Sequence, residues 1–478
     1  MPNYIFFDTE TNSGRQFADI LSINALFCSE DFKIISELNC EARLRKSRIY
    51  EVDSFLVNGF DPFEVDKHPL SNFELTKKVN DTFISWINKG PVLFCAHNGY
   101  SFDYLLTSQH LFSNLFTWPW IFSTGNAKQI DSLPIAQNYN FYAPNTIATE
   151  LNEKNNQIFR LGSLAKMNGF EITELHTARG DTMGMKLLME MLYKKNPELF
   201  QKSVSFTNKN DVLSKIKDVD YFCHPETFFG RTRQFTSSYL CEHPIFKGYH
   251  LCFDLKHDPE LMFSEKSNSV LKKTLNSAPK KYRTIKIGKN PFIQDKSFAT
   301  NFEDDYTTLG HEVLKSRADF ILKNREELAN RVSTIISDDI QDKTMDQTEL
   351  TPEQMIFSLN PSSSDKTLMN NYVIANSIDD KLRIHKGFEG PLKYLSEMIL
   401  LDQYDSEAFT DSDYKRIRKG ISRKLLSTNK EVFPTIPDGM ARIDQLREEK
   451  KDDKETLEKV ENINKHLELL TEEHEKYL

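Results

Sequence analysis

Two acidic residues stand two positions apart at the end of the first apolar run of the chain. The apolar residues 4–7 lead directly into Asp8, Thr9 and Glu10. Alternate residues of an extended strand point to the same face, so we expect the carboxylates of Asp8 and Glu10 to face one point. Such oxygens suit Mg²⁺ and Mn²⁺, and two ions about 4 Å apart can hold the attacking and the leaving oxygen of a phosphoryl transfer. The spacing therefore indicates a metal site for phosphoryl chemistry, with an ordinary turn at the strand end as the alternative.

The Asp-x-Glu triplet is not specific by itself. It recurs three times, and we expect those copies to be solvated surface acids: Asp258/Glu260, Asp405/Glu407 and Asp453/Glu455. The first copy differs because it ends a strand of buried character, where a charged group is costly without a partner.

A third carboxylate follows the apolar run 92–96. The segment from Asn98 to Asp103 reads Asn-Gly-Tyr-Ser-Phe-Asp and precedes a helical pattern. Asp103 could contribute to the same site, or it could only cap the helix, which is the commoner role of Asp in that position.

The third motif pairs His176 with Asp181, just before a helical stretch. Of the twelve histidines, this is the one with Asp five residues later. Histidine can act as a general base on water because its ordinary pKa lies near neutrality. A surface histidine in a loop is the alternative when the motif is taken alone. Three such motifs, in order and each at the expected end of a strand or helix, favour a common site.

Together the motifs Asp8-x-Glu10, Asn98-x-x-x-Phe-Asp103 and His176-x-x-x-x-Asp181 resemble the DEDD exonuclease superfamily, in the branch with histidine in its third motif. Further stretches are similar to the bacterial exonuclease I family, namely residues 15–18, 56–62, 159–161 and 166–169.

The resemblance implies a single-stranded-DNA-specific 3′-to-5′ exodeoxyribonuclease that releases nucleoside 5′-monophosphates in DNA repair or recombination. It implies two Mg²⁺ ions, for which Mn²⁺ can substitute. Asp8, Glu10 and Asp181 would be direct ligands, Asp103 would complete the site, and His176 would deprotonate the attacking water. Polarity and the preference for DNA come from the resemblance alone.

Substrate contacts are expected from other residues. Arg160 would bind a phosphate, because a guanidinium can pair with two phosphate oxygens, unless it is an ordinary surface arginine. Phe17, Asn98 and Tyr100 would line the pocket of the terminal nucleotide beside Glu10, although Asn98 could only brace its turn.

Aromatic residues alternate with Arg231 and Arg233 in the segment 228–235. Arginines can bind phosphates while rings stack on bases, which suits binding of a single strand without sequence preference. An ordinary amphipathic strand is the alternative.

The net charge of −9 is unusual for a nucleic-acid enzyme, but the charge is unevenly distributed. Residues 265–289 contain eight Lys or Arg against one acid, whereas the tail from Arg442 is rich in acids. By resemblance, the basic stretch 272–289 would receive the acidic C-terminal peptide of single-strand-binding protein. Six cysteines without metal-ligand spacing predict reduced thiols, and the lack of a signal sequence or membrane-spanning run predicts a cytoplasmic protein. A monomer is expected only because no oligomerisation seam stands out in the sequence.

Three domains are predicted. Residues 1–200 alternate strand-like runs with helical periods, which indicates an α/β domain, of ribonuclease-H-like exonuclease fold by resemblance. Residues 201–350 contain short β-like segments, among them 234–240, 250–255 and 283–287, which fit a small β-barrel-like domain, of SH3-like fold by resemblance. Residues 351–478 read as a helical C-terminal domain.

Three kinds of alternative remain. An RNA 3′-exonuclease or a proofreading exonuclease could share the same site. A non-catalytic single-stranded-DNA-binding protein could keep the fold, although it would have no use for clustered acids that repel phosphate. An interaction module acting through the acidic C-terminal helix would leave the three motifs unexplained.

Overall fold

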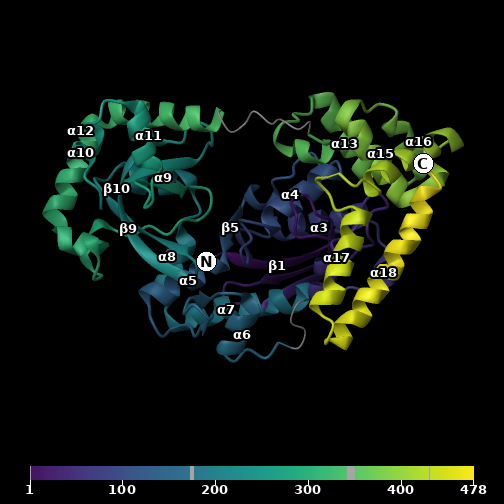
Figure 1. The fold of residues 1–478 in the computed structure, drawn as a ribbon, viewed down its shortest axis with the longest axis horizontal. Helices are drawn as coiled ribbons and strands as arrows, with labels where there is room; N and C mark the ends of the chain where they lie inside the picture. Colours follow the sequence, from purple (N-terminus) through teal and green to yellow (C-terminus); the bar gives the residue numbers. More distant parts are fainter. Residues whose placement is uncertain (1, 173–176, 342–349, 430) are drawn as a thin grey trace. The chain divides into compact units, whose positions relative to one another are not determined.

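The computed structural model describes residues 2–172, 177–341, 350–429 and 431–478 (Figure 1). Packing divides the chain into two compact units. The first unit consists of Met1–Lys128, Glu171–Lys186 and Leu350–Leu478, and the second of Gln129–Phe170 and Leu187–Glu349. The division into domains at 200 and 350 stays a prediction.

A five-stranded sheet forms the centre of the first unit, in the order β3-β2-β1-β4-β5. Its strands are β1 (Asn3–Thr11), β2 (Ile20–Cys28), β3 (Ile34–Glu41), β4 (Val92–Ala96) and β5 (Ala127–Asp131), of which the last crosses the boundary between the units. Strand β1 pairs antiparallel with β2 and parallel with β4. Every residue of β2 and β4 is buried, which fits the continuous apolar sequence of β4, whereas β2 also buries the polar residues Ser22 and Asn24.

The α-helices of the first unit that precede residue 200 are α1 (Val52–Asn58), α2 (Pro62–Asp66), α3 (Asn72–Ile87), α4 (Asp103–Ser113) and α7 (Ala178–Lys195), and the last of them continues past Lys186 into the second unit. Helix α3 begins with a capping box in which Ser71 and Glu74 bond each other's main-chain N–H groups. Apolar side chains of α3 and α4 join those of the strands in one core, and Figure 1 draws both helices on the side of β1 opposite α7.

The helical segment 350–478 packs on the same unit. Its helices are α13 (Ser363–Ile374), α14 (Ile378–His385), α15 (Gly390–Tyr404), α16 (Asp411–Leu425), α17 (Ile436–Glu449) and α18 (Lys454–Glu475), with short 3₁₀ turns at Pro352–Phe357 and Asp405–Ala408. One core joins α1 to α16, α17 and α18, and another joins α3 and α4 to α13 and α15.

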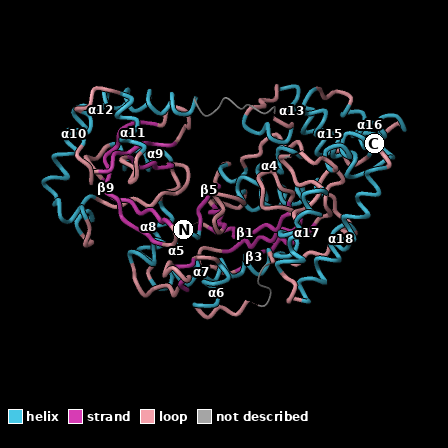
Figure 2. Tube along the Cα trace, viewed as in Figure 1, coloured by secondary structure: helices cyan, strands magenta, loops and turns pink. Residues whose placement is uncertain are grey.

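The second unit contains an antiparallel sheet in the order β11-β10-β9-β8. Its strands are β8 (Phe222–Phe228), β9 (Arg231–Glu242), β10 (Tyr249–Asp254) and β11 (Tyr282–Lys286), and a separate hairpin pairs β6 (Glu150–Leu151) with β7 (Gln157–Ile158). Figure 2 shows these strands in magenta. The helices are α5 (Ser132–Tyr142), α6 (Leu161–Met167), α8 (Pro197–Ser205), α9 (Lys209–Lys217), α10 (Pro259–Phe263), α11 (Asn268–Asn276) and α12 (Asp305–Gln341).

The strands and helices expected in residues 1–200, the β segments near 234–240, 250–255 and 283–287, and the C-terminal helices are all present. Helix α12 is a correction, because the β-rich texture expected for 201–350 does not include this long helical segment, which is kinked at Gly310. Its apolar side chains pack on the sheet of the second unit.

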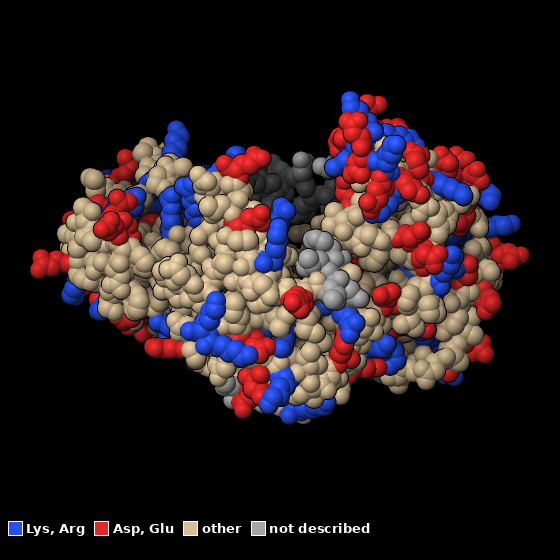
Figure 3. Space-filling model, turned by 90° about the horizontal axis from the view of Figure 1, so that it is seen from below, with Lys and Arg blue, Asp and Glu red and all other residues tan. Residues whose placement is uncertain are grey.

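The cysteines, the hydropathy of the helices and the distribution of charge can be compared with the expectations from the sequence. All six cysteines are free thiols, and five of them are buried. Among the described residues, no helix has the length and apolar character needed to cross a bilayer. Basic and acidic side chains are interspersed on the face drawn in Figure 3, so the excess of acids forms no single acidic face there.

Candidate active site

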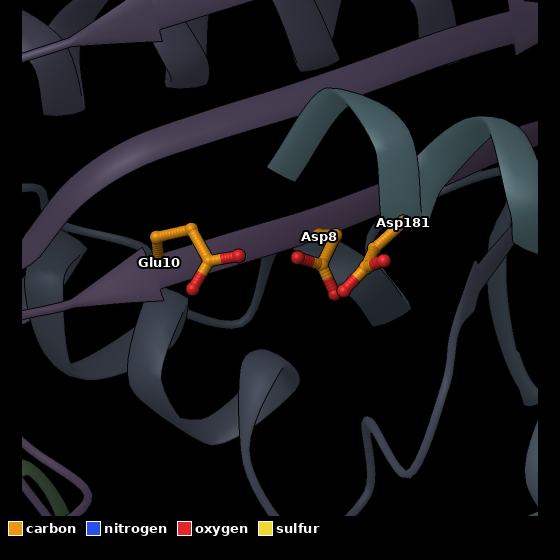
Figure 4. Close-up of side chains that lie close together, drawn as sticks. All are labelled: Asp8, Glu10 and Asp181. Carbon is orange, nitrogen blue, oxygen red and sulfur yellow. The ribbon is translucent and has the colours of Figure 1, made fainter. Parts of the chain in front are cut away.

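Three carboxylates from distant parts of the sequence come together in the first unit. Asp8, Glu10 and Asp181 each offer an oxygen, and these oxygens lie within 4.8 Å of one another. Figure 4 shows Asp8 and Glu10 on the same strand and Asp181 on a helix, with the three carboxylates directed toward a common space. The shared face of Asp8 and Glu10 agrees with the alternation expected from the sequence.

Contacts across the sheet explain why Asp181 meets Asp8. Asp8 pairs with Asn24 in the register of β1 and β2. The buried hydroxyl of Thr182 lies 2.7 Å from the main-chain oxygen of Ala178 in its own helix and 3.2 Å from that of Asn24. The first turn of α7 is thereby fixed beside the strand position opposite Asp8, and the neighbouring Asp181 is aimed at the site.

The fourth predicted acid, Asp103, is the first residue of α4 and is 4% exposed. The Thr9 hydroxyl donates to Asp103 Oδ1 at 2.7 Å, a buried hydrogen bond between β1 and α4. Asp103 also contributes to the electrostatic environment of Asp8 and Glu10. It therefore lies next to the three gathered carboxylates, although it is outside the close group itself. Thr9 is a site residue that the sequence analysis did not identify.

The turn between β4 and α4 is built by Asn98 and Gly99. Asn98 has a positive φ of 61°, a conformation that asparagine tolerates better than most residues. A Cβ on Gly99 would lie 2.4 Å from that of Ala96, so only glycine fits. The turn closes with the Ser101 N–H donating to the Asn98 oxygen at 3.0 Å. Asn98 thus braces this turn, and its predicted contact with substrate stays a prediction.

The carboxylates destabilise one another's charged forms. Burial raises the pKa of Asp8 well above its usual range, and the charges of Asp103, Glu10 and Asp181 raise this pKa further. Burial and the charges of Asp181 and Asp103 raise the pKa of Glu10 to about 8. A group of acids held together against this repulsion is the usual environment of a bound cation.

The residues present fit a divalent metal ion. The close group supplies only carboxylate oxygens, which suits hard cations such as Mg²⁺ and Mn²⁺ better than softer metals. A cation there would compensate the repulsion that raises the pKa values of Asp8 and Glu10.

The remaining predicted residues of the first unit have defined positions. Phe17 has a positive φ of 65°, and its N–H donates to the Gln109 side chain of α4 at 3.3 Å. Tyr100 is half-buried, with its ring 5.4 Å from that of Tyr104. His176 lies outside the described residues, so its predicted role is not addressed by the structure.

Arg160, Arg231 and Arg233 belong to the second unit, and each is exposed. Arg160 precedes α6. Arg231 and Arg233 line a groove of about 1000 Å³ in the sheet domain of that unit. Lys154 and Lys280 also line this groove, and the sequence analysis identified neither as a substrate contact. These two lysines are far apart in the sequence, and only the folded structure shows that they line the same groove.

This groove has exposed aromatic rings, and the arginine at its bottom is paired with a carboxylate. Phe229, at the turn between β8 and β9, is 90% exposed, and Phe228 is 47% exposed. On the floor, Arg283 stacks on Phe235 with 3.7 Å from its guanidinium carbon to the ring centroid, and it pairs with Asp254 at 3.0 Å. The floor is thus close to neutral, while the cations at the rim give the groove a positive character suited to a polyanion.

Comparisons with known proteins point to one group. No protein-family model matches the chain. Exodeoxyribonuclease I of Buchnera aphidicola subsp. Schizaphis graminum is 23% identical over 246 residues, which cover 50% of this chain and 49% of that protein. Exodeoxyribonuclease I of Buchnera aphidicola subsp. Baizongia pistaciae is 23% identical over 278 residues, or 56% of each chain. The chain spans about half the length of these curated relatives in the alignments.

Solved structures match over nearly the whole chain. Exonuclease I from Methylocaldum szegediense has a TM-score of 0.83 at 15% identity and covers 98% of this chain and 100% of its own. E. coli exonuclease I in complex with a dA16 oligonucleotide has a TM-score of 0.81 at 16% identity, with 99% and 100% covered. A structure of SSB/exonuclease I with an inhibitor has a TM-score of 0.78 at 16% identity, with 98% and 99% covered. The predicted fold class and the resemblance to bacterial exonuclease I are confirmed.

Proposed function

We propose that this chain is a metal-dependent exodeoxyribonuclease that digests single-stranded DNA from its 3′ end and releases nucleoside 5′-monophosphates. The observation that carries this proposal is the convergence of Asp8, Glu10 and Asp181 within 4.8 Å, on a fold shared with exonuclease I. A protein that only bound DNA would gain nothing from acids that repel phosphate.

The residues of the first unit have different roles in the proposed reaction. Asp8, Glu10 and Asp181 hold the metal, and Asp103, fixed by Thr9, completes the site. His176 accepts the proton of the attacking water, a role that rests on the motif spacing. When bound, two Mg²⁺ or Mn²⁺ ions supply charge stabilisation at the attacking and the leaving oxygen. Phe17, Asn98 and Tyr100 position the terminal nucleotide beside Glu10.

The second unit has residues of its own for binding single-stranded DNA. Arg231 and Arg233 bind phosphates in the groove, and the exposed ring of Phe229 stacks on bases, because stacking is tolerant of sequence. Arg160 contacts a phosphate in the same unit.

A protein partner is also proposed. A solved relative is described as SSB/exonuclease I. In this chain the basic stretch 272–289 presents Lys272 and Lys273 on α11, which would bind the acidic C-terminal peptide of a single-strand-binding protein. The chain would act with these partners as a cytoplasmic monomer in DNA repair or recombination.

The test follows a 5′-labelled single-stranded DNA on a denaturing gel in Mg²⁺. We expect a ladder of shortening products that keep the label, and no products in excess EDTA. Asp8→Asn should lower the rate at least about 100-fold, because each loss of about 1.4 kcal/mol of transition-state stabilisation costs a factor of ten and metal sites supply several kcal/mol.

Asp453→Asn is the matched control. It comes from another Asp-x-Glu triplet, where Asp453 is exposed and caps α18. This variant should digest DNA at the rate of the unaltered protein. Intact DNA with folded protein in Mg²⁺ would contradict the proposal, and digestion of RNA in its place would favour an RNA 3′-exonuclease.

A further inference from the structure

The loop that joins β1 to β2, residues 12–19, begins two positions after Glu10 and is closed by bonds between its ends. The Asn12 N–H donates to the main-chain oxygen of Asp19 at 3.1 Å, and the Asp19 N–H donates to the Asn12 side chain at 2.7 Å. The Asn12 amide also donates to the main-chain oxygen of Ile49 at 2.6 Å. Both end residues are buried, so the loop has a fixed base next to the strand that carries the acids.

Phe17 in this loop is held in an unfavourable backbone conformation. Its φ of 65° lies in the left-handed region, which is uncommon for a residue with a large side chain. Such strain persists only where the surroundings fix it, and it is concentrated at catalytic and ligand-binding sites. The half-buried ring packs against the core that joins α3 and α4 to α13 and α15. The position of this ring therefore depends on contacts that support the strained backbone.

Helix α4 supplies these contacts through two consecutive side chains. Gln109 is buried, and its Oε1 accepts the N–H of Phe17 at 3.3 Å. His110 is also buried, and its Nε2 lies 2.9 Å from the main-chain nitrogen of Ile20 and 3.0 Å from the main-chain oxygen of Ala18. Through that one atom a neutral ring accepts from Ile20 or donates to Ala18, depending on its tautomer. Either form ties the loop to α4 within three residues of Phe17.

The contact made by His110 lowers the stability of the fold relative to an apolar side chain at the same place. Burial lowers the pKa of the imidazole to about 4, and the charge of Arg45 lowers it further, so the ring is neutral at pH 7. Its Nδ1 is buried and has no hydrogen-bond partner among the residues that the structure describes. A buried polar atom without a partner is destabilising. The polar contribution of His110 is therefore made through Nε2, at the loop.

The same helix carries an acid of the candidate active site. Asp103 and His110 are seven residues apart in α4, which places them on one face of the helix, about 10 Å apart along its axis. The Thr9 hydroxyl bonds Asp103 on this face, and the main chain at Ile20 bonds His110. Helix α4 thus contacts both the strand of the acids and the loop of Phe17, and it sets the distance between them.

We propose that Gln109 and His110 are positioning residues for the 3′-terminal nucleotide of the DNA, because they hold the Phe17 ring at a fixed distance from the carboxylates. This inference rests on the proposed function, in which Phe17 lines the pocket of that nucleotide. A displaced ring would stack less well on the terminal base. The two side chains act on binding of the strand end and not on the chemical step, since their polar contacts are with the loop.

The first measurement compares KM and kcat for digestion of single-stranded DNA in Mg²⁺. His110→Leu and Gln109→Met each remove the polar atom at the loop. We expect KM to rise about tenfold and about threefold, respectively, with kcat within about twofold, because loss of binding that is equal in the ground and transition states changes KM alone. His110→Gln keeps an acceptor and a donor and should restore most of the lost affinity.

His474→Leu is the matched control for lost stability. His474 is as buried as His110, and it bonds Ser422 between α18 and α16, with no printed contact to the loop in the described part of the chain. This variant should lower Tm and leave KM unchanged.

A second measurement does not depend on digestion. In an Asp8→Asn background, an oligonucleotide with 2-aminopurine at its 3′ end reports stacking of the terminal base by its fluorescence. His110→Leu and Gln109→Met should reduce the fluorescence change on binding, but not that of a label at the 5′ end. If the unaltered chain digests no DNA and this 3′ signal still responds to the variants, the proposed activity is wrong and the positioning role stands. Unchanged KM and 3′ signal in both variants, a fall in kcat alone, or no 3′ signal at all would overturn the inference.

Discussion

At the scale of single residues, Thr9 links the two halves of the proposed metal site. Its hydroxyl fixes one oxygen of Asp103. Thr9→Val keeps the shape and removes the donor, and we expect the apparent affinity for Mg²⁺ or the rate to fall about 10–100-fold, as for partners of metal ligands elsewhere. The measurement is the Mg²⁺ concentration that gives half-maximal digestion, together with the Mg²⁺-induced shift in Tm.

Thr9→Ser supplies the control, because serine keeps the hydroxyl and should restore most of the Mg²⁺ response. A lower Tm with an unchanged Mg²⁺ dependence in Thr9→Val would mean that Thr9 only stabilises the fold.

Residue spacing predicted part of this site and not the rest. Asp8 and Glu10 share a face because alternation is a local property of a strand. Asp181 comes from a helix whose first turn contacts Asn24 through Thr182, and no spacing rule in the sequence reveals that contact. The order of the motifs favoured a common site, but the role of each acid in it came from the resemblance to a known family.

At the scale of elements, the turn between β8 and β9 forms part of the groove of the second unit. Phe229 and Gly230 both have positive φ, and a Cβ on Gly230 would lie 2.2 Å from the main-chain oxygen of Gln157. The turn is therefore pressed against β7, which holds Phe229 outward on a fixed support. The alternation of rings and arginines was visible in the sequence, but the contact between Gly230 and Gln157 was not.

We expect the groove and α11 to serve different ligands. Arg233→Gln should weaken binding of single-stranded DNA and lower the slope of log K against log salt by about 0.7, the value for one lost phosphate contact. Lys272→Gln with Lys273→Gln should instead weaken binding of an acidic peptide. Fluorescence anisotropy with a labelled oligonucleotide and a labelled peptide measures both.

Lys194→Gln is a suitable control, since Lys194 is exposed on α7 and pairs with Glu190. Equal losses for both ligands in either variant would argue against separate sites.

Helix α12 shows why an element can be overlooked. Its buried residues Leu314, Ala318, Ile321, Leu328 and Val332 follow helical spacing, so the signal was present. Many charged residues stand between them, because only one side of the helix contacts the sheet, and the apolar pattern is therefore harder to recognise in the sequence.

At the scale of the whole molecule, buried neutral histidines link stability to pH. Burial lowers the pKa of His224 to about 3, and the nearby charge of Arg283 lowers it further. Its Nε2 contacts the Ser237 hydroxyl at 3.1 Å, and Glu226 lies 3.8 Å from its Nδ1. Unfolding would restore a pKa near 6.5, so the unfolded chain binds more protons between pH 6.5 and 3 and the folded state loses stability as the pH falls through that range.

His224→Gln removes this proton uptake while keeping a polar side chain. The difference in unfolding free energy between the variant and the unaltered protein should shift in favour of the variant by about 2 kcal/mol from pH 7.5 to pH 5. Urea unfolding followed by circular dichroism at both pH values, in Mg²⁺, gives this difference. Taking a difference cancels the opposite contribution of Asp402, whose pKa burial raises to about 6 and whose effect both proteins share. Parallel pH profiles would show that His224 is protonated in the folded state, and Glu226 would then be the partner that stabilises it.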